Sequence, residues 1–230
     1  MTPTLLVPGL ICTAELFAPQ LPALWPRGPV TVASTLEGDT ISAMASAILR
    51  DAPPRFALGG LSMGGYIALE ILRQAPDRVA RLALMDTSAR PDTPEQTRVR
   101  QGLIATTGDG QYETVLATTV PNLLHPEHRA DQALIGILIR MGRVVGADGF
   151  ARQQGAIMGR IDSRPFLSAV AVPTLVLVGD KDALTPPEMA REMAEAIPDA
   201  ELVIVPDAGH VSTLEQPAAV NAALLDWLAA

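Results

Sequence analysis

The chain has 230 residues, of which 48% are apolar and 18% are charged, and its formal net charge is −8. This length and composition exclude a disordered polypeptide and predict one globular domain with a large core. The negative charge and the absence of basic runs argue against a nucleic-acid partner, because binding to phosphates depends on clustered Lys and Arg.

The single cysteine, Cys12, excludes an internal disulfide and a cysteine-rich metal site. The first ten residues lack the basic segment of a secretion signal. Gly, Pro or charged residues interrupt each apolar run well before the roughly 20 residues that a membrane span needs. We therefore expect a cytoplasmic protein without a membrane partner, and the sequence leaves a homodimer open.

Short apolar runs alternate with helix-like segments along most of the chain. The expected strands lie at residues 4–7, 30–34, 56–60, 82–86, 174–179 and 201–206, and the expected helices at 40–50, 63–75, 187–197 and 215–229. Most of the runs are continuous, which is typical of strands covered on both faces. This alternation predicts an α/β fold with a doubly wound, mostly parallel sheet and a ligand site at the carboxyl ends of its strands.

The alternation stops between about residues 90 and 165, where the pattern becomes purely helical. One segment there is apolar on both sides at helical spacing, and a helix that apolar is normally covered. We expect residues 90–165 to form a helical cap, inserted after the fourth strand into a core of residues 1–89 and 166–230. This cap should decide the substrate.

Several cap residues are open to more than one interpretation. Four apolar residues either line a substrate pocket or pack within the cap: Met141, Phe150, Ile157 and Met158. Arg160 either meets a substrate carboxylate, pairs with Asp162 or is a solvated charge.

Ser62 is the centre of a G-x-S-x-G pattern that begins at Gly60 and ends at Gly64, between an expected strand and an expected helix. A sharp strand-to-helix turn holds such a serine in a strained conformation, and small flanking residues let the strand and helix approach each other. This context predicts a nucleophile elbow with the Ser62 hydroxyl exposed at a helix N-terminus.

A serine hydroxyl needs a base to take its proton, and the chain has three histidines. His210 follows the last expected strand, where its side chain can reach the elbow. His125 and His128 form an H-x-x-H pattern in the expected cap, without the carboxylate or cysteine set that would complete a metal site. We interpret both as exposed loop residues, which makes His210 the predicted base.

The base must be oriented by a carboxylate. Asp180 and Asp182 follow the fifth expected strand, and Asp86 ends the fourth. Asp180 and Asp182 lie between Ser62 and His210, so the order along the chain is Ser, Asp, His, which is that of the α/β-hydrolase arrangement.

The elbow, the acid loop and the histidine loop together resemble the α/β-hydrolase superfamily, among the small capped esterases and enol-lactonases, over nearly the whole chain. The resemblance implies that Asp182 is the orienting acid, at the end of a G-x-x-D loop that starts at Gly179. Asp180 then caps backbone groups or faces solvent. Asp86 is the alternative candidate for the orienting acid, because some relatives carry the acid after that strand. The family commonly has two strands ahead of the strand at 4–7, so we expect a trimmed sheet of about six strands.

The resemblance also implies an oxyanion hole made by the backbone N–H groups of Met63 and Leu10. Pro8 stands where many relatives have histidine, but a backbone donor does not need that histidine. Cys12, in the same loop, lies outside the elbow and is expected to be a buried apolar residue. Glu215 and Pro217 resemble structural positions of the segment that leads into the family's final helix.

These features predict a serine hydrolase that cleaves small carboxylic esters or lactones through an acyl-enzyme, with Ser62, Asp182 and His210 as its catalytic triad and no metal or organic cofactor. Carbon-carbon bond hydrolysis, perhydrolysis and cofactor-free lyase chemistry on the same triad are alternatives. A ligand-binding protein that kept the fold without turnover is another. Epoxide hydrolases and haloalkane dehalogenases resemble this fold but need a carboxylate at the position of Ser62.

Overall fold

A computed structural model describes residues 1–229. Its core is a six-stranded sheet with the order β2-β1-β3-β4-β5-β6, in which every neighbouring pair is parallel. The strands are β1 (Thr4–Val7), β2 (Val30–Val32), β3 (Phe56–Leu61), β4 (Val79–Met85), β5 (Thr174–Gly179) and β6 (Glu201–Val205). The expected parallel α/β sheet of about six strands is confirmed.

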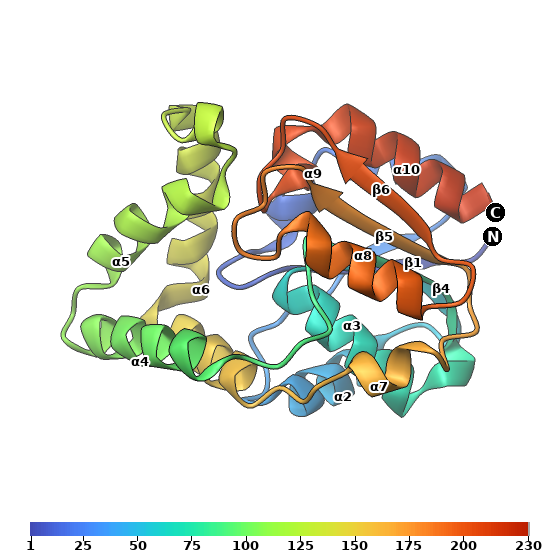
Figure 1. Ribbon diagram of the computed structural model, residues 1–230, viewed down its shortest axis with the longest axis horizontal. Coiled ribbons are helices and arrows are strands. Elements are labelled where there is room, and N and C mark those ends of the chain that lie inside the picture. Colours follow the sequence, from blue (N-terminus) through green and yellow to red (C-terminus); the bar gives the residue numbers. More distant parts are fainter. Residues whose placement is uncertain (230) are drawn as a thin grey trace.

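Helices cover both faces of this sheet (Figure 1). On one face lie α2 (Ile41–Asp51), α3 (Met63–Gln74) and α8 (Pro187–Ala196), and on the other α1 (Leu21–Leu24) and α10 (Pro217–Ala229). Side chains of β1 alternate between the two buried clusters, with Leu5 and Val7 in one and Leu6 in the other. Burial on both faces explains why the strand sequences are continuously apolar.

The strand order reverses at β1, which has β2 on one side and β3 on the other. Chain segments leaving β1 and β3 therefore diverge at the carboxyl edge of the sheet, and this is where ligands bind in open α/β sheets. Residues 8–12 follow β1 directly, and Ser62 follows β3. The short remaining elements are η1 (Ala14–Phe17), η2 (Trp25–Arg27), η3 (Pro76–Arg78) and α9 (Ser212–Glu215).

The segment between β4 and β5 is helical, as expected. It contains α4 (Pro94–Gly108), α5 (Tyr112–Thr119), η4 (Val120–Leu123), η5 (Pro126–His128), α6 (Gln132–Met158) and the short α7 (Arg164–Leu167). Figure 1 shows α4, α5 and α6 as a group on the side of the sheet toward which the arrows of β5 and β6 point. This group is the helical cap after the fourth strand. Helix α6 is broken at Gly146, whose φ of 73° is not helical, so it consists of two arms.

The cap shares a buried core with the sheet. Met141 and Phe150 of α6 belong to the same apolar cluster as Leu61 and Met85, at the ends of β3 and β4. Both cap side chains are therefore core residues. None of the helices within residues 1–229 combines the length and the apolarity that crossing a bilayer requires.

Candidate active site

Ser62 occupies a sharp turn between β3 and α3, with a φ of 57° and a ψ of −118°. This conformation is sparsely populated for residues other than glycine, and such strain persists only where the surroundings hold it. A Cβ at Gly60 would lie 2.2 Å from the carbonyl oxygen of Gly64, and one at Gly64 would lie 2.0 Å from that of Val7. The turn therefore requires glycine on both sides of Ser62.

The backbone of Ser62 is held from β4. Its N–H donates to the Met85 carbonyl at 2.9 Å, and the Thr87 hydroxyl donates to the Ser62 carbonyl at 2.7 Å. A Cβ at Gly65 would lie 2.4 Å from that hydroxyl oxygen, so a third glycine lets the threonine approach. These contacts fix the position from which the Ser62 side chain projects.

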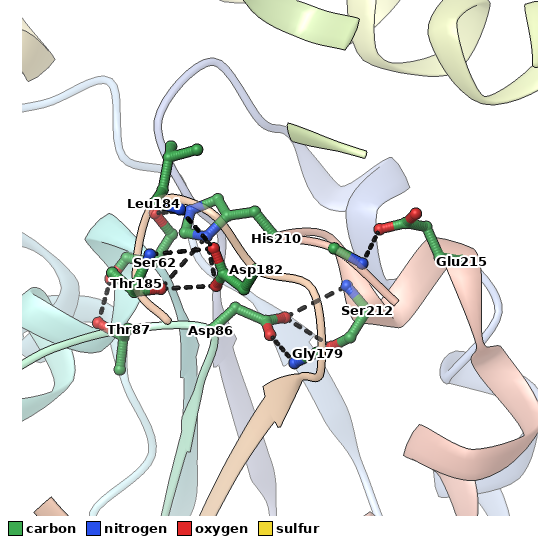
Figure 2. A network of polar contacts seen from close by, with 11 residues as sticks. Ser62, Asp86, Thr87, Gly179, Asp182, Leu184, Thr185, His210, Ser212 and Glu215 are labelled. Carbon is green, nitrogen blue, oxygen red and sulfur yellow. Dashed lines mark hydrogen bonds and ion pairs between the residues drawn. The ribbon is translucent and has the colours of Figure 1, made fainter. Parts of the chain in front are cut away.

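A chain of hydrogen bonds runs from Ser62 to a carboxylate (Figure 2). Ser62 Oγ lies 2.8 Å from His210 Nε2, and His210 Nδ1 lies 2.8 Å from Asp182 Oδ2. His210 comes from the loop after β6 and Asp182 from the loop after β5, and both are buried. The structure thus brings together the three residues that the sequence singled out.

Asp182 is held in one orientation by its own loop. Oδ1 accepts the N–H groups of Leu184 at 2.8 Å and Thr185 at 3.0 Å. Oδ2, which faces His210, also accepts the Thr185 hydroxyl at 2.7 Å. Thr185 was not among the residues singled out from the sequence, although an Asp side chain in a loop commonly accepts backbone N–H groups of the residues that follow it.

The pKa values of this pair follow from burial and mutual attraction. Burial lowers the pKa of His210, but the negative charge of Asp182 and their hydrogen bond outweigh it, and the net pKa lies above the ordinary 6.5. For Asp182, burial raises the pKa, but His210 and the donors of Thr185 outweigh it and the net pKa is lowered. The carboxylate therefore stays ionised and stabilises a proton on the imidazole.

Asp86 is fully buried but makes no hydrogen bond to His210 within the described residues. Its Oδ1 accepts the Gly179 N–H at 2.9 Å, and its Oδ2 accepts the Ser212 hydroxyl at 2.6 Å and N–H at 3.2 Å (Figure 2). Burial, and then the charge of Asp182, raises the pKa of Asp86 to about 7. Asp86 therefore ties the acid loop to the histidine loop.

Asp180, the other candidate acid, is partly exposed. Its Oδ1 accepts the N–H of Ala208 at 3.3 Å, so it supports the loop after β6 from outside the hydrogen-bond chain.

The loop after β1 lies against the elbow, because a Cβ at Gly9 would be 3.3 Å from the Cβ of Ser62. Within residues 1–229, neither the N–H of Leu10 nor that of Met63 donates to a protein acceptor. The first N–H groups of a helix have no partner within it, which leaves the Met63 N–H available to a ligand. Cys12 is buried, and burial raises the pKa of its thiol to about 12, so it stays protonated.

The expectation that His125 and His128 are exposed loop residues is wrong for His125, which is only 6% exposed. The carboxylate of Glu215, from α9, accepts the N–H of His125 at 2.7 Å and lies 2.9 Å from Nδ1 of His128. It also accepts the N–H of Gly209, beside His210, at 2.8 Å. A buried carboxylate needs several donors, and here they come from two loops far apart in sequence.

These histidines do not assemble a metal site. No group of three or more His, Cys, Asp or Glu side chains in residues 1–229 is placed to hold a metal ion.

The pairing of Arg160 with Asp162, one of the alternatives that the sequence left open, is wrong. Arg160 forms a buried ion pair with Asp92, donates from Nε to the Arg90 carbonyl at 2.9 Å, and stacks over the ring of Tyr66 at 4.4 Å. Asp162 pairs with Arg164 instead. Arg160 thus anchors the return of the cap to the core.

A family model described as the alpha/beta hydrolase fold matches residues 52–217, which include the elbow, the acid loop and the histidine loop. The chain belongs to the α/β-hydrolase fold family. Its six-stranded parallel sheet with an inserted helical cap agrees with that assignment.

Several members of this family are similar to the chain over most of its length. A thermophilic esterase from Thermogutta terrifontis has a TM-score of 0.89 and 33% identity, covering 100% of this chain and 90% of that one. The enol-lactonase from Burkholderia xenovorans has a TM-score of 0.90 and 26% identity, covering 100% and 92%. A pimeloyl-[acyl-carrier protein] methyl ester esterase of Neisseria meningitidis is 28% identical over 223 residues, 91% of this chain and 70% of that protein. The chain is an α/β-fold hydrolase with relatives of the esterase and lactonase kind.

Proposed function

We propose that this hydrolase cleaves small carboxylic esters or lactones through an acyl-enzyme formed on Ser62. The proposal rests on the hydrogen-bond chain from Ser62 Oγ through His210 to Asp182, which starts at a serine held in a strained turn. This is the arrangement that activates a serine hydroxyl as a nucleophile. The names of the similar proteins, two esterases and an enol-lactonase, support carboxylic esters and lactones as the substrate class.

In the first half of the reaction, Ser62 Oγ attacks the carbonyl carbon while its proton passes to His210 Nε2. Asp182 orients the ring and stabilises the imidazolium. The carbonyl oxygen becomes an oxyanion, which accepts hydrogen bonds from the N–H groups of Met63 and Leu10. When the tetrahedral intermediate collapses, the bond to the leaving oxygen breaks and His210 gives that oxygen its proton.

In the second half, water attacks the acyl-enzyme carbonyl and gives a proton to His210 Nε2. Collapse of the second intermediate breaks the bond to Ser62 Oγ, which takes the proton back from His210. An ester yields an acid and an alcohol, whereas a lactone yields one hydroxy acid. None of these steps uses a metal or an organic cofactor.

We further propose that residues 90–165 act as the cap that limits which substrates reach Ser62. Helices α4 to α6 lie beyond the carboxyl ends of the strands (Figure 1), which is where the loop after β1 and the elbow meet. The side chain of Gln153 accepts the N–H of Ile11 in the loop after β1, and the backbone carbonyl of Leu123 accepts the N–H of His210 at 2.7 Å. A cap in this place restricts access to the nucleophile.

Two assays on the purified protein test the proposal: hydrolysis of p-nitrophenyl esters of increasing chain length and of simple lactones, and labelling by a fluorophosphonate. We expect both in the parent, and Ser62→Ala should lose labelling and about 10⁶-fold in kcat. Ser46→Ala, at an exposed serine of α2, is the control and should match the parent.

Three outcomes contradict the proposal in different ways. Hydrolysis by Ser62→Ala at a rate near the parent's excludes Ser62 as the nucleophile. Labelling of the parent without hydrolysis of any ester or lactone indicates another reaction of the activated serine. The absence of both labelling and hydrolysis indicates a ligand-binding protein.

A further inference from the structure

Gln153 is a polar cap residue on α6 that is only 1% exposed. Burying a carboxamide is unfavourable unless it is hydrogen bonded. Here Oε1 accepts the N–H of Ile11 at 3.0 Å, and Nε2 donates to the hydroxyl of Thr35 at 3.0 Å and to its carbonyl at 3.4 Å. One side chain of the cap therefore joins the loop after β1 to the loop after β2.

The backbone that Gln153 contacts is a strained turn. The Cys12 N–H donates to the Gly9 carbonyl at 3.1 Å, which closes a turn over residues 9–12. Ile11, its third residue, has a φ of 60°. A positive φ at this position characterises a type II turn and favours Gly or Asn, so a β-branched residue there costs on the order of 1–3 kcal/mol. Something outside the turn must hold it.

Gln153 stabilises the turn through a hydrogen bond to its central peptide. Type I and type II turns differ by a flip of the peptide between the second and third residues, here Leu10 and Ile11. The Ile11 N–H belongs to that peptide, and its bond to Gln153 Oε1 favours the flipped form. A second contact from α6 acts on the same segment, because Met141 Sδ accepts the N–H of Thr13 at 3.4 Å.

We propose that Gln153 is a positioning residue: it fixes the Leu10–Ile11 peptide and with it the conformation of the turn, so that the Leu10 N–H, on the preceding peptide, is directed at the oxyanion formed on Ser62. This inference rests on the proposed function and assigns part of its oxyanion hole to the cap. The oxyanion exists only after attack by the serine. Loss of the hydrogen bond between Gln153 and Ile11 therefore lowers kcat and leaves KM nearly unchanged.

The test compares Gln153→Met with Gln154→Met in hydrolysis of a p-nitrophenyl ester. Gln154 is the matched control, because it is the next residue on α6, is also 1% exposed, and accepts Arg100 Nη1 at 2.7 Å without touching the turn. Gln153→Met should lower kcat about ten- to a hundredfold, a part of what loss of a whole oxyanion donor costs, with KM within about twofold. Gln154→Met should keep kcat within about threefold.

Two further measurements separate positioning from a general loss of structure. Gln153→Glu keeps an acceptor oxygen for the Ile11 N–H and should restore most of kcat. The affinity for an alkyl boronic acid, which forms a tetrahedral adduct on serine, should fall in Gln153→Met in proportion to kcat. If Gln153→Met does not fold, Gln153→Asn replaces it, because its carboxamide is one methylene too short to reach Ile11.

An unchanged kcat in folded Gln153→Met or Gln153→Asn overturns the inference. Equal losses of kcat in Gln153→Met and Gln154→Met, or a rise in KM without a fall in kcat, also overturn it. These results leave the proposed function standing, because the parent still hydrolyses the ester. A parent that hydrolyses no ester contradicts the proposed function itself, and the boronic acid affinity then decides the positioning role.

Discussion

Replacing Asp182 with asparagine keeps the size of the side chain but changes one acceptor into a donor. In the native site Oδ1 accepts two backbone N–H groups, from Leu184 and Thr185, whereas Oδ2 lies 2.8 Å from His210 Nδ1. Only the oxygen of an asparagine can accept from those two N–H groups. The loop therefore turns the new NH₂ group toward His210.

An NH₂ group at this position favours an imidazole with no proton on Nδ1. The proton then sits on Nε2, which faces Ser62 Oγ at 2.8 Å. This tautomer cannot take the serine proton. By analogy with the serine proteases, we expect Asp182→Asn to lower kcat on the order of 10⁴-fold, which corresponds to about 5 kcal/mol of barrier.

The assay is steady-state hydrolysis of a p-nitrophenyl ester, with circular dichroism to show that each variant is folded. Asp86→Asn is the matched control, because Asp86 is also a buried carboxylate but accepts from Gly179 and Ser212. It should lose less than about tenfold in kcat, since the His210 tautomer is unaffected. A crippled Asp86→Asn beside a nearly normal Asp182→Asn would refute this reasoning.

The acid limb of the pH profile of kcat/KM should have an apparent pKa above the ordinary histidine value of 6.5, because Asp182 raises the pKa of His210 and the base acts only when neutral. Activity should therefore rise as the pH increases through that raised pKa, and a limb at or below the ordinary value would contradict the assignment. Gly60→Ala should strongly destabilise the fold in chemical denaturation, because its Cβ would lie 2.2 Å from the Gly64 carbonyl oxygen. Gly102→Ala, a helical control on α4 with nothing within 4 Å of its Cβ, should stabilise by about 0.5–1 kcal/mol, and equal effects of the two substitutions would count against the clash.

The sheet and the elbow were predictable because their causes are local. All six residues of β5 are buried, so a strand covered on both faces leaves a continuous apolar run in the sequence. Gly60 and Gly64 lie within two residues of Ser62, and the clash that Gly60 avoids is a local one, with the carbonyl of Gly64. The start of β4 was less visible, because the strand begins at Val79 and includes Arg81, which interrupts the apolar run.

The residues around Ser62 were predicted by type and order, and their catalytic roles remain predictions. The sequence placed Asp182, Asp180 and Asp86 at the ends of strands that finish at one edge of the sheet. Strand order predicts no more than this, because it does not give the direction of a side chain. The structure puts the carboxylate of Asp182 beside His210 and turns that of Asp86 toward Gly179 and Ser212. The direction of each side chain depends on donors from other loops.

Only the tertiary structure decided how the cap and the core are joined. Gln153 contacts Ile11 across 142 positions and Glu215 accepts the His125 N–H across 90, whereas Arg160 pairs with Asp92 across 68 positions within the cap itself. Each is a polar group buried by packing, and its partner is whichever donor or acceptor the packed chain brings within reach. No periodicity or local motif records such a choice, because the free energy that selects the partner exists only once both segments are folded together.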